Sequence, residues 1–274
     1  MVRTLAAFLL ATLSLMQLAG AQQATPEQKA QLAPTGALRA AIVTIPFLAK
    51  KDSAGGLTGV APDLAAEMAR VLGVPYEPTA FGPPNAGIAA LRDGKADITF
   101  LAPTPERIAQ VDFAPEFMGM EVTLIVPGGS SIRTLADADQ PRRKLVVYEK
   151  TANEEMVRKA VTQAQILYVP LFAYQKAFDM LRSGDADGYV DLRDQLVSHQ
   201  KELPESRIIP GAYGRNAMAI GYAKDKPAAA AFVKQFTDAM VKSGFVTRAI
   251  EKSGVQGAVA PDRKSTRLNS SHRT

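Results

Sequence analysis

Arg107 is the residue whose position in the sequence points most directly to a chemical role. Thr104 and Pro105 precede it in the order typical of a helix N-cap and first helical turn. The helix dipole disfavours a cation this close to the N-terminus, and a bound anion would relieve that cost. We therefore expect Arg107 to hold an anion. The alternative is a surface arginine paired with Glu106 or Asp112.

Residues 151–154 form a second group whose pattern suggests a chemical role, either helix capping or anion binding. Their sequence, TANE, has the spacing of a capping box, in which the threonine hydroxyl and the glutamate carboxylate each accept a backbone N–H at a helix start. The N–H groups at such a helix start can also bind an anion. The pattern predicts a helix from Ala152 and allows Thr151 to serve as cap, ligand contact or both.

The composition excludes most catalytic and metal chemistry. The 274 residues include no cysteine and two histidines, which excludes a thiol nucleophile, a disulfide and a multi-histidine metal centre. His199 lies in a polar stretch that predicts an exposed helix, and no G-x-S-x-G, H-E-x-x-H, P-loop or G-x-G-x-x-G motif occurs. Acid–base catalysis would depend on carboxylates such as Asp191 or Glu149. We therefore expect no catalytic group, metal or cofactor.

The N-terminus has the pattern of a secretory signal peptide. Arg3 precedes an apolar run over residues 5–18, and the small residues of 19–21 end it. The apolar run is shorter than the roughly 18 residues that a membrane helix needs. We therefore expect residues 1–21 to be a signal peptide and the protein to be periplasmic.

The C-terminus explains the basic charge of the chain. Residues 263–274 show no helical or strand periodicity and look like a translated sequencing adapter. We interpret them as non-native and 261–274 as a disordered tail. Without Arg3 and the four cations of this tail, acidic and basic side chains balance over 22–262, so the net charge of +5 arises at the ends. A nucleic-acid partner is therefore excluded.

The body of the chain shows alternating strand and helix patterns. Residues 22–36 are rich in Gln, Ala and Pro and are interpreted as a linker. Beyond them, apolar periodicity predicts strands near 38–45, 96–101, 121–126, 144–148 and 217–222, and helices near 62–72, 86–93, from 152, and over 227–243 and 244–253.

A short repeat divides this body in two. Residues 91–97, LRDGKAD, recur as LRSGDAD at 181–187, and similar elements precede both copies. In each copy we expect the glycine to cap a helix and the last aspartate to open a strand. Two βαβαβ units imply two α/β lobes, each with a mostly parallel sheet flanked by helices.

Three segments resemble the bacterial periplasmic solute-binding proteins of family 3, which typically bind amino acids for ABC importers. They are GVAPDLA at 59–65, AALRDGKAD at 89–97 and TPERIAQVDFAP at 104–115. The third is similar to the family signature T-P-E-R-x-x-x-V-D-F-S-x-P. The resemblance spans about 37–255 and implies a venus-flytrap fold with a two-strand hinge. Its expected parts are lobe I over 37–118, lobe II over 119–213 and a return to lobe I over 214–260.

The resemblance also implies ligand contacts. Arg107 would bind the α-carboxylate of the ligand, because its planar guanidinium matches a carboxylate with two hydrogen bonds. Thr151 would face the ligand from the second lobe, and Phe47 would stack on it or pack in the core. The full set of expected ligand contacts is Arg107, Thr151, Phe47, Thr99, Phe100, Asp191, Lys150 and Ala152.

Three positions depart from the family pattern. Ala102 stands where a Ser or Thr is usual, and Lys150 stands where glycine is usual. The family's acceptor for an amino group would fall at Leu192; Asp191 lies one residue early and should face the other side of its strand unless a bulge re-aims it. The ammonium of Lys150 would favour an anionic ligand or be solvated. Whether the ligand is an α-amino acid or a carboxylated compound without an amino group stays open.

These expectations describe a periplasmic binding protein of an ABC importer. It would close on a small carboxylated solute by hinge motion, present both lobes to a membrane permease and act as a monomer. The alternative is a periplasmic enzyme on the same scaffold, such as a dehydratase acting on a cyclic carboxylate, because a fold does not decide a function.

Overall fold

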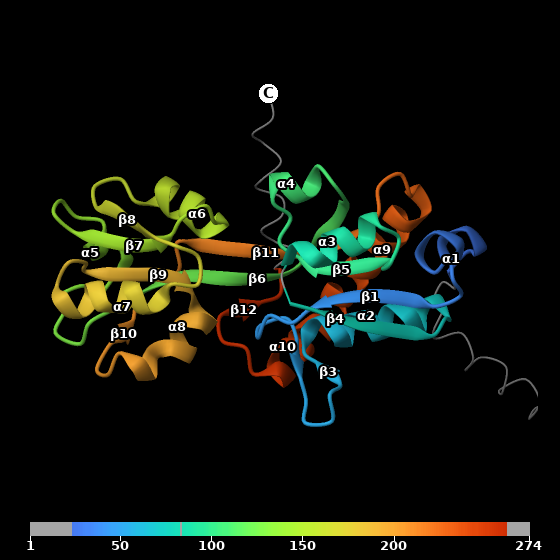
Figure 1. Cartoon of the computed structure of the whole chain (residues 1–274), viewed down its shortest axis with the longest axis horizontal. Helices are drawn as coiled ribbons and strands as arrows, with labels where there is room; N and C mark the ends of the chain where they lie inside the picture. The colour runs from blue at the N-terminus through green and yellow to red at the C-terminus, as the bar shows by residue number, and fades with distance from the viewer. Residues whose placement is uncertain (1–23, 83, 262–274) are drawn as a thin grey trace, which may run out of the picture.

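The computed structural model describes residues 24–82 and 84–261. The expected signal peptide, and the expected tail apart from residue 261, lie outside the described residues. Two groups of elements, which we call lobe I and lobe II, stand at opposite ends of one long sheet (Figure 1).

Lobe I contains α1 (Pro26–Leu32), β1 (Leu38–Val43), β2 (Lys50–Lys51), β3 (Leu57–Thr58), α2 (Val60–Leu72), β4 (Tyr76–Phe81), α3 (Pro84–Arg92), β5 (Ile98–Leu101), α4 (Pro105–Ile108), α9 (Pro227–Lys242) and α10 (Phe245–Ser253). Lobe II contains α5 (Leu135–Ala138), β7 (Lys144–Tyr148), α6 (Ala152–Ala160), β8 (Gln165–Val169), α7 (Tyr174–Ser183), β9 (Gly188–Leu192), α8 (Arg193–His199), the 3₁₀ helix η1 (Gln200–Glu202) and β10 (Arg207–Ile208). The strands that join the lobes are β6 (Asp112–Val126) and β11 (Gly214–Tyr222), and the short β12 (Ala258–Val259) pairs with β6 between them.

The sheet runs without a break from one lobe to the other. Its order is β4-β1-β5-β11-β6-β9-β7-β8, with β10 and β12 both paired to β6. The ladders among β4, β1 and β5 and among β9, β7 and β8 are parallel, and the ladders become antiparallel where β11 meets β5 and β6 meets β9. β10 also pairs antiparallel with β6, and β2 and β3 form a separate antiparallel pair. This is the expected α/β fold of two lobes with mostly parallel sheets.

Two long strands cross between the lobes, and a short one lies beside them. β6 and β11 pair antiparallel along their length, with Gly119 opposite Ala217. β12 lies on β6 at the same level, and the Glu121 N–H donates to the Gly257 carbonyl at 2.9 Å. Arg193 of lobe II also pairs with Glu121 at 2.7 Å. The end of the described chain is therefore fastened where the lobes meet.

β6 is longer than the strand expected over 121–126. Pro115 and Gly119 in its first half look like strand breakers in sequence. The β6–β11 ladder shifts register beside Ala219, which leaves Pro115 without a paired residue. Gly119 lies against the Arg215 side chain, where a Cβ would come within 3.1 Å of a side-chain carbon. Tertiary pairing thus overrides both local signals.

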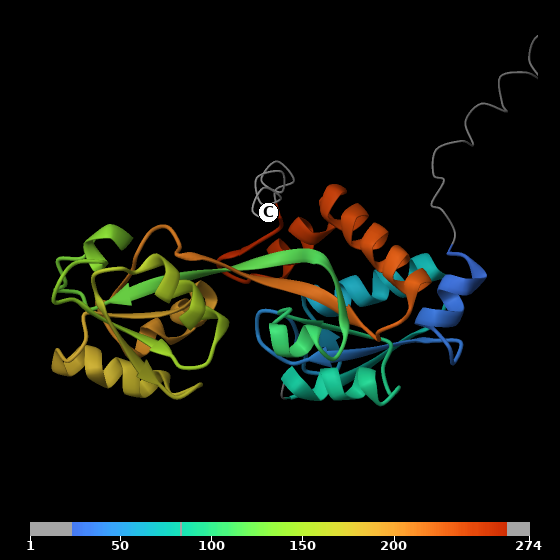
Figure 2. The same cartoon turned by 90° about the horizontal axis from the view of Figure 1, so that it is seen from above.

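Helices cover both faces of the sheet in each lobe. The side chains of β1 alternate: Ile42 belongs to the core cluster beneath α2, α9 and α10, whereas Ala41 and Val43 pack towards α3. Figure 2 shows α9 beside α1, with α3 on the opposite face. In lobe II the strand β7 alternates in the same way between the α6 side and the α7–α8 side.

The two copies of the repeat make the same local structure. Gly94 and Gly184 are both left-handed, with φ of 67° and 78°, as expected for helix caps. Asp97 accepts the backbone N–H of Arg39 at 2.9 Å, and Asp187 accepts that of Lys144 at 2.8 Å. In each lobe the aspartate thus fastens the start of the neighbouring parallel strand.

Residues 24–36, the described part of the segment interpreted as a linker, contain a helix. The structure places α1 there, with a capping box between Thr25 and Gln28. Leu32 is 1% exposed, and Gln31 accepts a hydrogen bond from the Lys226 ammonium at 3.0 Å. Gln and Ala are good helix formers, so the same residues that suggested a linker form a helix once α9 offers a surface to pack on.

Candidate ligand-binding cleft

An open cleft of about 1090 Å³ is lined by residues of both lobes. The β5–α4 loop and α4 form its lobe I wall, the start of α6 forms its lobe II wall, and β11 passes between them. Figure 1 shows α4 and α6 on the same side of the β6–β11 crossing. The lining residues are Asn85, Ala102, Pro103, Thr104, Pro105, Glu106, Arg107, Lys150, Thr151, Ala152, Glu154, Glu155, Arg158, Lys159, Leu171, Asn216 and Ala217.

Arg107 is half-buried in the lobe I wall and has no ion-pair partner among the described residues. Asp112, one of the two partners considered from the sequence, instead pairs with Lys224 at 3.6 Å. One guanidinium nitrogen of Arg107, Nη1, donates to the Ala102 carbonyl at 2.9 Å, which leaves most of its five N–H donors free. Burial lowers the pKa of Arg107 below its ordinary value. An incoming anion would compensate that loss of solvation.

Arg107 is positioned by a short helix that the sequence indicated. Thr104 has extended backbone angles at the N-cap and Pro105 is the first residue of α4, but the Thr104 hydroxyl makes no capping hydrogen bond. The backbone N–H of Arg107 donates to the Thr104 carbonyl at 3.0 Å, which closes the turn. This turn orients the guanidinium back towards Ala102, at the end of β5.

The lobe II wall presents hydrogen-bond donors at the start of α6. The Thr151 hydroxyl accepts from the Glu154 N–H at 3.1 Å and donates to the Tyr148 carbonyl at 2.9 Å, so its proton is already used. The backbone N–H groups of Thr151 and Ala152 have no acceptor among the described residues. Thr151 therefore caps the helix, and the donors left for a ligand at this point are main-chain groups.

Lys150 enters the cleft from a backbone conformation that glycine adopts most easily. Its φ of 58° lies in the left-handed region, and its N–H donates to the Glu154 carboxylate. Glu154 also pairs with Arg158 at 3.6 Å. The capping box thus differs from the expected one, because the glutamate reaches the N–H of Lys150 rather than that of Thr151.

Asp191 lies inside lobe II, not on the cleft wall. The residue is 4% exposed, and both carboxylate oxygens are occupied: Oδ1 accepts from the Leu192 N–H at 2.8 Å and the Asn153 amide at 3.2 Å, and Oδ2 accepts from the Tyr189 hydroxyl at 2.7 Å. Asp191 therefore lies on the same side of its strand as Tyr189, as strand alternation requires, and neither Asp191 nor Leu192 lines the cleft.

The buried Asp191 should give the protein a measurable pH dependence. Burial raises its pKa to about 6, against about 3.9 in an unfolded chain. Between about pH 4 and 6 the folded state keeps the proton and the unfolded state releases it, so the free energy of unfolding falls as pH rises through this window. The loss is on the order of 2 kcal/mol.

The Asp191→Asn variant should lack this contribution, because the amide does not titrate. Urea unfolding at pH 4.5 and at pH 7 should show that the free energy of unfolding of the variant, relative to that of the wild type, rises by about 2 kcal/mol over that interval. A difference between the two proteins that stays constant with pH would contradict the buried carboxylate as its source.

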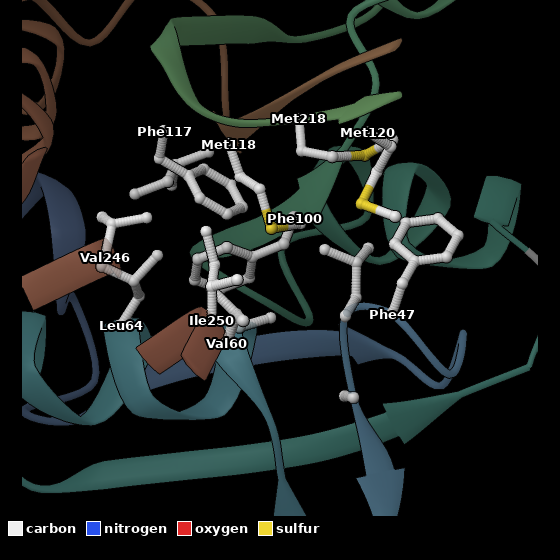
Figure 3. Close-up of a cluster of buried hydrophobic side chains, with 14 of the residues drawn as sticks. Phe47, Val60, Leu64, Phe100, Phe117, Met118, Met120, Met218, Val246 and Ile250 are labelled. Carbon is white, nitrogen blue, oxygen red and sulfur yellow. The ribbon is translucent and has the colours of Figure 1, made fainter. Parts of the chain in front are cut away.

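Phe47, Thr99 and Phe100 belong to the interior of lobe I and do not line the cleft. Phe47 is 6% exposed and shares a core cluster with Phe100 (Figure 3). Phe100 packs edge-on against Phe117, with 5.9 Å between ring centroids. The Thr99 hydroxyl donates to the Ala41 carbonyl at 2.8 Å. For Phe47 the structure shows the core packing that the sequence had left as one of two options.

The structure also brings residues to the cleft that the sequence did not indicate. Asn216 and Ala217 line it because β11 crosses between the lobes at that point. Leu171 reaches it from the loop after β8, and Asn85 from the start of α3. No local pattern marks these positions, since each depends on how strands and loops from distant parts of the chain meet.

No group of three or more His, Asp or Glu within 24–82 and 84–261 could hold a metal ion. His199 does not line the cleft; it stacks on Tyr174 with ring centroids 3.7 Å apart, and burial lowers its pKa. None of the helices in this part of the chain has the length and apolarity to span a bilayer.

Residues 39–255 match the bacterial extracellular solute-binding proteins, family 3. No curated protein matches the chain. Among solved structures, an ancestral arginine-binding protein bound to glutamine is 26% identical, with a TM-score of 0.56, over 81% of this chain and 98% of that one. An ancestral amino acid-binding protein, a precursor of cyclohexadienyl dehydratase, is 27% identical, with a TM-score of 0.57, over 80% of this chain and 95% of that one.

A third structure extends the likeness in fold alone. The solute receptor for L-cysteine of Neisseria gonorrhoeae is 24% identical, with a TM-score of 0.58, and the match covers 82% of this chain and 93% of that one. Nearly the whole length of each of these three proteins is therefore matched by the body of this chain.

Proposed function

Because the chain belongs to the bacterial extracellular solute-binding proteins of family 3, we propose that it is the substrate-binding component of an ABC importer and binds a small carboxylated solute between its lobes. The observation that carries this proposal is Arg107, a half-buried arginine without an ion-pair partner among the described residues, in the wall of the cleft. Its free donors suit the two oxygens of a carboxylate. The protein would act in the periplasm as a monomer and deliver the solute to a membrane permease.

The donors of the second wall support a mechanism of closure. Lys150 and the free N–H groups at the start of α6 lie in lobe II, whereas Arg107 lies in lobe I. A ligand held by both walls binds the closed state better than the open one and so shifts the population towards closure. β6 and β11 would bend where Gly119 pairs with Ala217, near the proposed lobe border at residues 118 and 119.

An enzyme on the same scaffold has less support. Catalysis would need a positioned acid–base pair in the cleft. Asp191 is enclosed in lobe II, His199 lies outside the cleft lining, and the cleft carboxylate Glu154 is engaged by Lys150 and Arg158. The likeness to a precursor of cyclohexadienyl dehydratase is the observation that favours this second candidate, although that protein is itself described as amino acid-binding.

Ligand binding should stabilise the purified protein against heat. At a concentration a hundred times its Kd, a ligand adds about 2.7 kcal/mol, which corresponds to roughly 5–10 °C in Tm for a protein of this size. The screen should cover the amino acids, dicarboxylates, and aromatic and keto acids. Small-angle scattering of the protein with each hit should then show a smaller radius of gyration. Hits confined to solutes without a carboxylate, or binding without compaction, would contradict the proposal.

A further inference from the structure

We propose that the cleft selects a solute with two anionic groups and no ammonium, with one group bound by Arg107 and the other by Lys150. This inference rests on the proposed function and names the class of solute. It follows from the supply of donors and acceptors on the two walls, from the burial of Asp191 and from the backbone conformation of Lys150.

Both walls supply donors where a ligand would contact them. Arg107 offers free guanidinium N–H groups from lobe I, and Lys150 offers an ammonium without an ion-pair partner among the described residues from lobe II. Arg158 and Lys159 add two further cations to the lobe II side. A ligand with one carboxylate would satisfy Arg107 and leave Lys150 unpaired when the lobes close around it.

The carboxylates that could accept hydrogen bonds from a ligand ammonium are either already hydrogen-bonded or exposed to solvent. Asp191 is enclosed and accepts three hydrogen bonds within lobe II. Glu154 accepts from the Lys150 N–H and pairs with Arg158. The other carboxylates of the cleft, Glu106 and Glu155, are exposed, as Lys150 is, but the four cations of the lining outnumber its three carboxylates. An α-ammonium would thus lose its hydration without gaining a buried partner.

Lys150 has a left-handed backbone conformation, which residues other than glycine rarely adopt. A non-glycine residue in the left-handed region carries strain of about 1 kcal/mol or more. The described residues include four others at positive φ, Arg142, Phe172, Glu205 and Asp225, and none of them lines this cleft. Backbone strain at a ligand-facing position is expected where the side chain contributes to ligand binding, because the binding energy offsets the loss in folding stability.

The test compares two series of ligands that differ only in the amino group. Straight-chain dicarboxylates from malonate to adipate, together with 2-oxoglutarate, are titrated by calorimetry against aspartate, glutamate and 2-aminoadipate, with butyrate as the monocarboxylate. We expect a dicarboxylate or oxo-dicarboxylate to bind at least about 10-fold more tightly than its amino counterpart and than butyrate.

The Lys150→Gly variant should separate binding from folding. It should weaken dicarboxylate binding by about 10-fold or more, leave butyrate binding within about twofold, and raise the Tm of the free protein because glycine relieves the left-handed backbone. Arg142→Gly is the matched control: Arg142 is an exposed cation with a φ of 73° outside the cleft, so this variant should raise the Tm without changing affinity.

Three results would overturn the inference. The first is an α-amino acid that binds more tightly than its amino-free counterpart and depends on Arg107; the proposed function would then stand, and Glu155→Gln would test whether Glu155 accepts the ammonium. The second is dicarboxylate affinity that is equal in the wild type and Lys150→Gly. The third is no binding by either series, in which case the wider thermal screen decides the proposed function separately.

Discussion

Replacing Arg107 by alanine should weaken binding of the carboxylated ligand by about 100-fold or more. Each hydrogen bond from a charged donor to a carboxylate contributes on the order of 1.5–3 kcal/mol, and a guanidinium can form two of them in parallel. One donor, on Nη1, is held by the Ala102 carbonyl, and the others are available because no carboxylate among the described residues occupies them. Isothermal titration of both proteins with the best ligand of the thermal screen measures the loss.

The control variants separate ligand contact from folding. Arg107→Lys keeps the charge without the planar fork and should lie between the wild type and Arg107→Ala in affinity. Arg142→Ala removes an exposed cation outside the cleft and should bind normally. The Tm of the free protein should change little in Arg107→Ala, since a half-buried cation without a salt bridge contributes little to stability. Wild-type affinity and ligand-induced compaction in Arg107→Ala would rule out its proposed role.

Replacing Asp97 by alanine should lower the free energy of unfolding by about 3–4 kcal/mol. The Asp97 side chain is 4% exposed and accepts two hydrogen bonds from the Arg39 guanidinium, at 2.7 and 3.0 Å. It also accepts the backbone N–H of Arg39. The hydrogen bond to Asp97 is the main cause that raises the pKa of Arg39. Without the carboxylate, a guanidinium that is 22% exposed and a strand-opening N–H lose their acceptor.

The repeat provides the matched control for this prediction. Asp187 occupies the same position in lobe II and pairs with Arg143 at 2.7 Å, but these side chains are 28% and 31% exposed. Solvent screens that pair, so Asp187→Ala should cost only about 1 kcal/mol. Urea unfolding followed by circular dichroism measures both. Equal losses in the two variants would show that burial is not what distinguishes the two ion pairs.

Much of the fold could be predicted from local patterns. The repeat of 91–97 at 181–187 implied two α/β units, and the glycine caps and strand-opening aspartates occur in both. The helix from Ala152 begins where the capping signal placed it, and the helix from Pro227 begins where apolar periodicity placed it. The glycine caps and the helix starts depend on residues close in sequence, so periodicity and capping chemistry are sufficient to predict them.

The features that the sequence could not predict depend on distant partners. The helix α1 needs the surface of α9, and the first half of β6 tolerates Pro115 and Gly119 only because β11 pairs beside them with a shifted register. The pairing of β12 with β6 at Gly119 and Met120 likewise joins segments more than 130 residues apart. Local composition cannot predict such pairings, because the surface that stabilises each segment comes from a distant part of the chain.

The sequence by itself determined the family, the two-lobe α/β architecture and the chemistry of the candidate cleft at four positions, Arg107, Lys150, Thr151 and Ala152, which the structure brings to one surface. Only the tertiary structure decided that Phe47, Thr99, Phe100 and Asp191 are interior residues. A residue type sets what a side chain can bind. Whether it meets a ligand or the core depends on which face of a strand it occupies and what packs there, and that is settled only when distant elements come together.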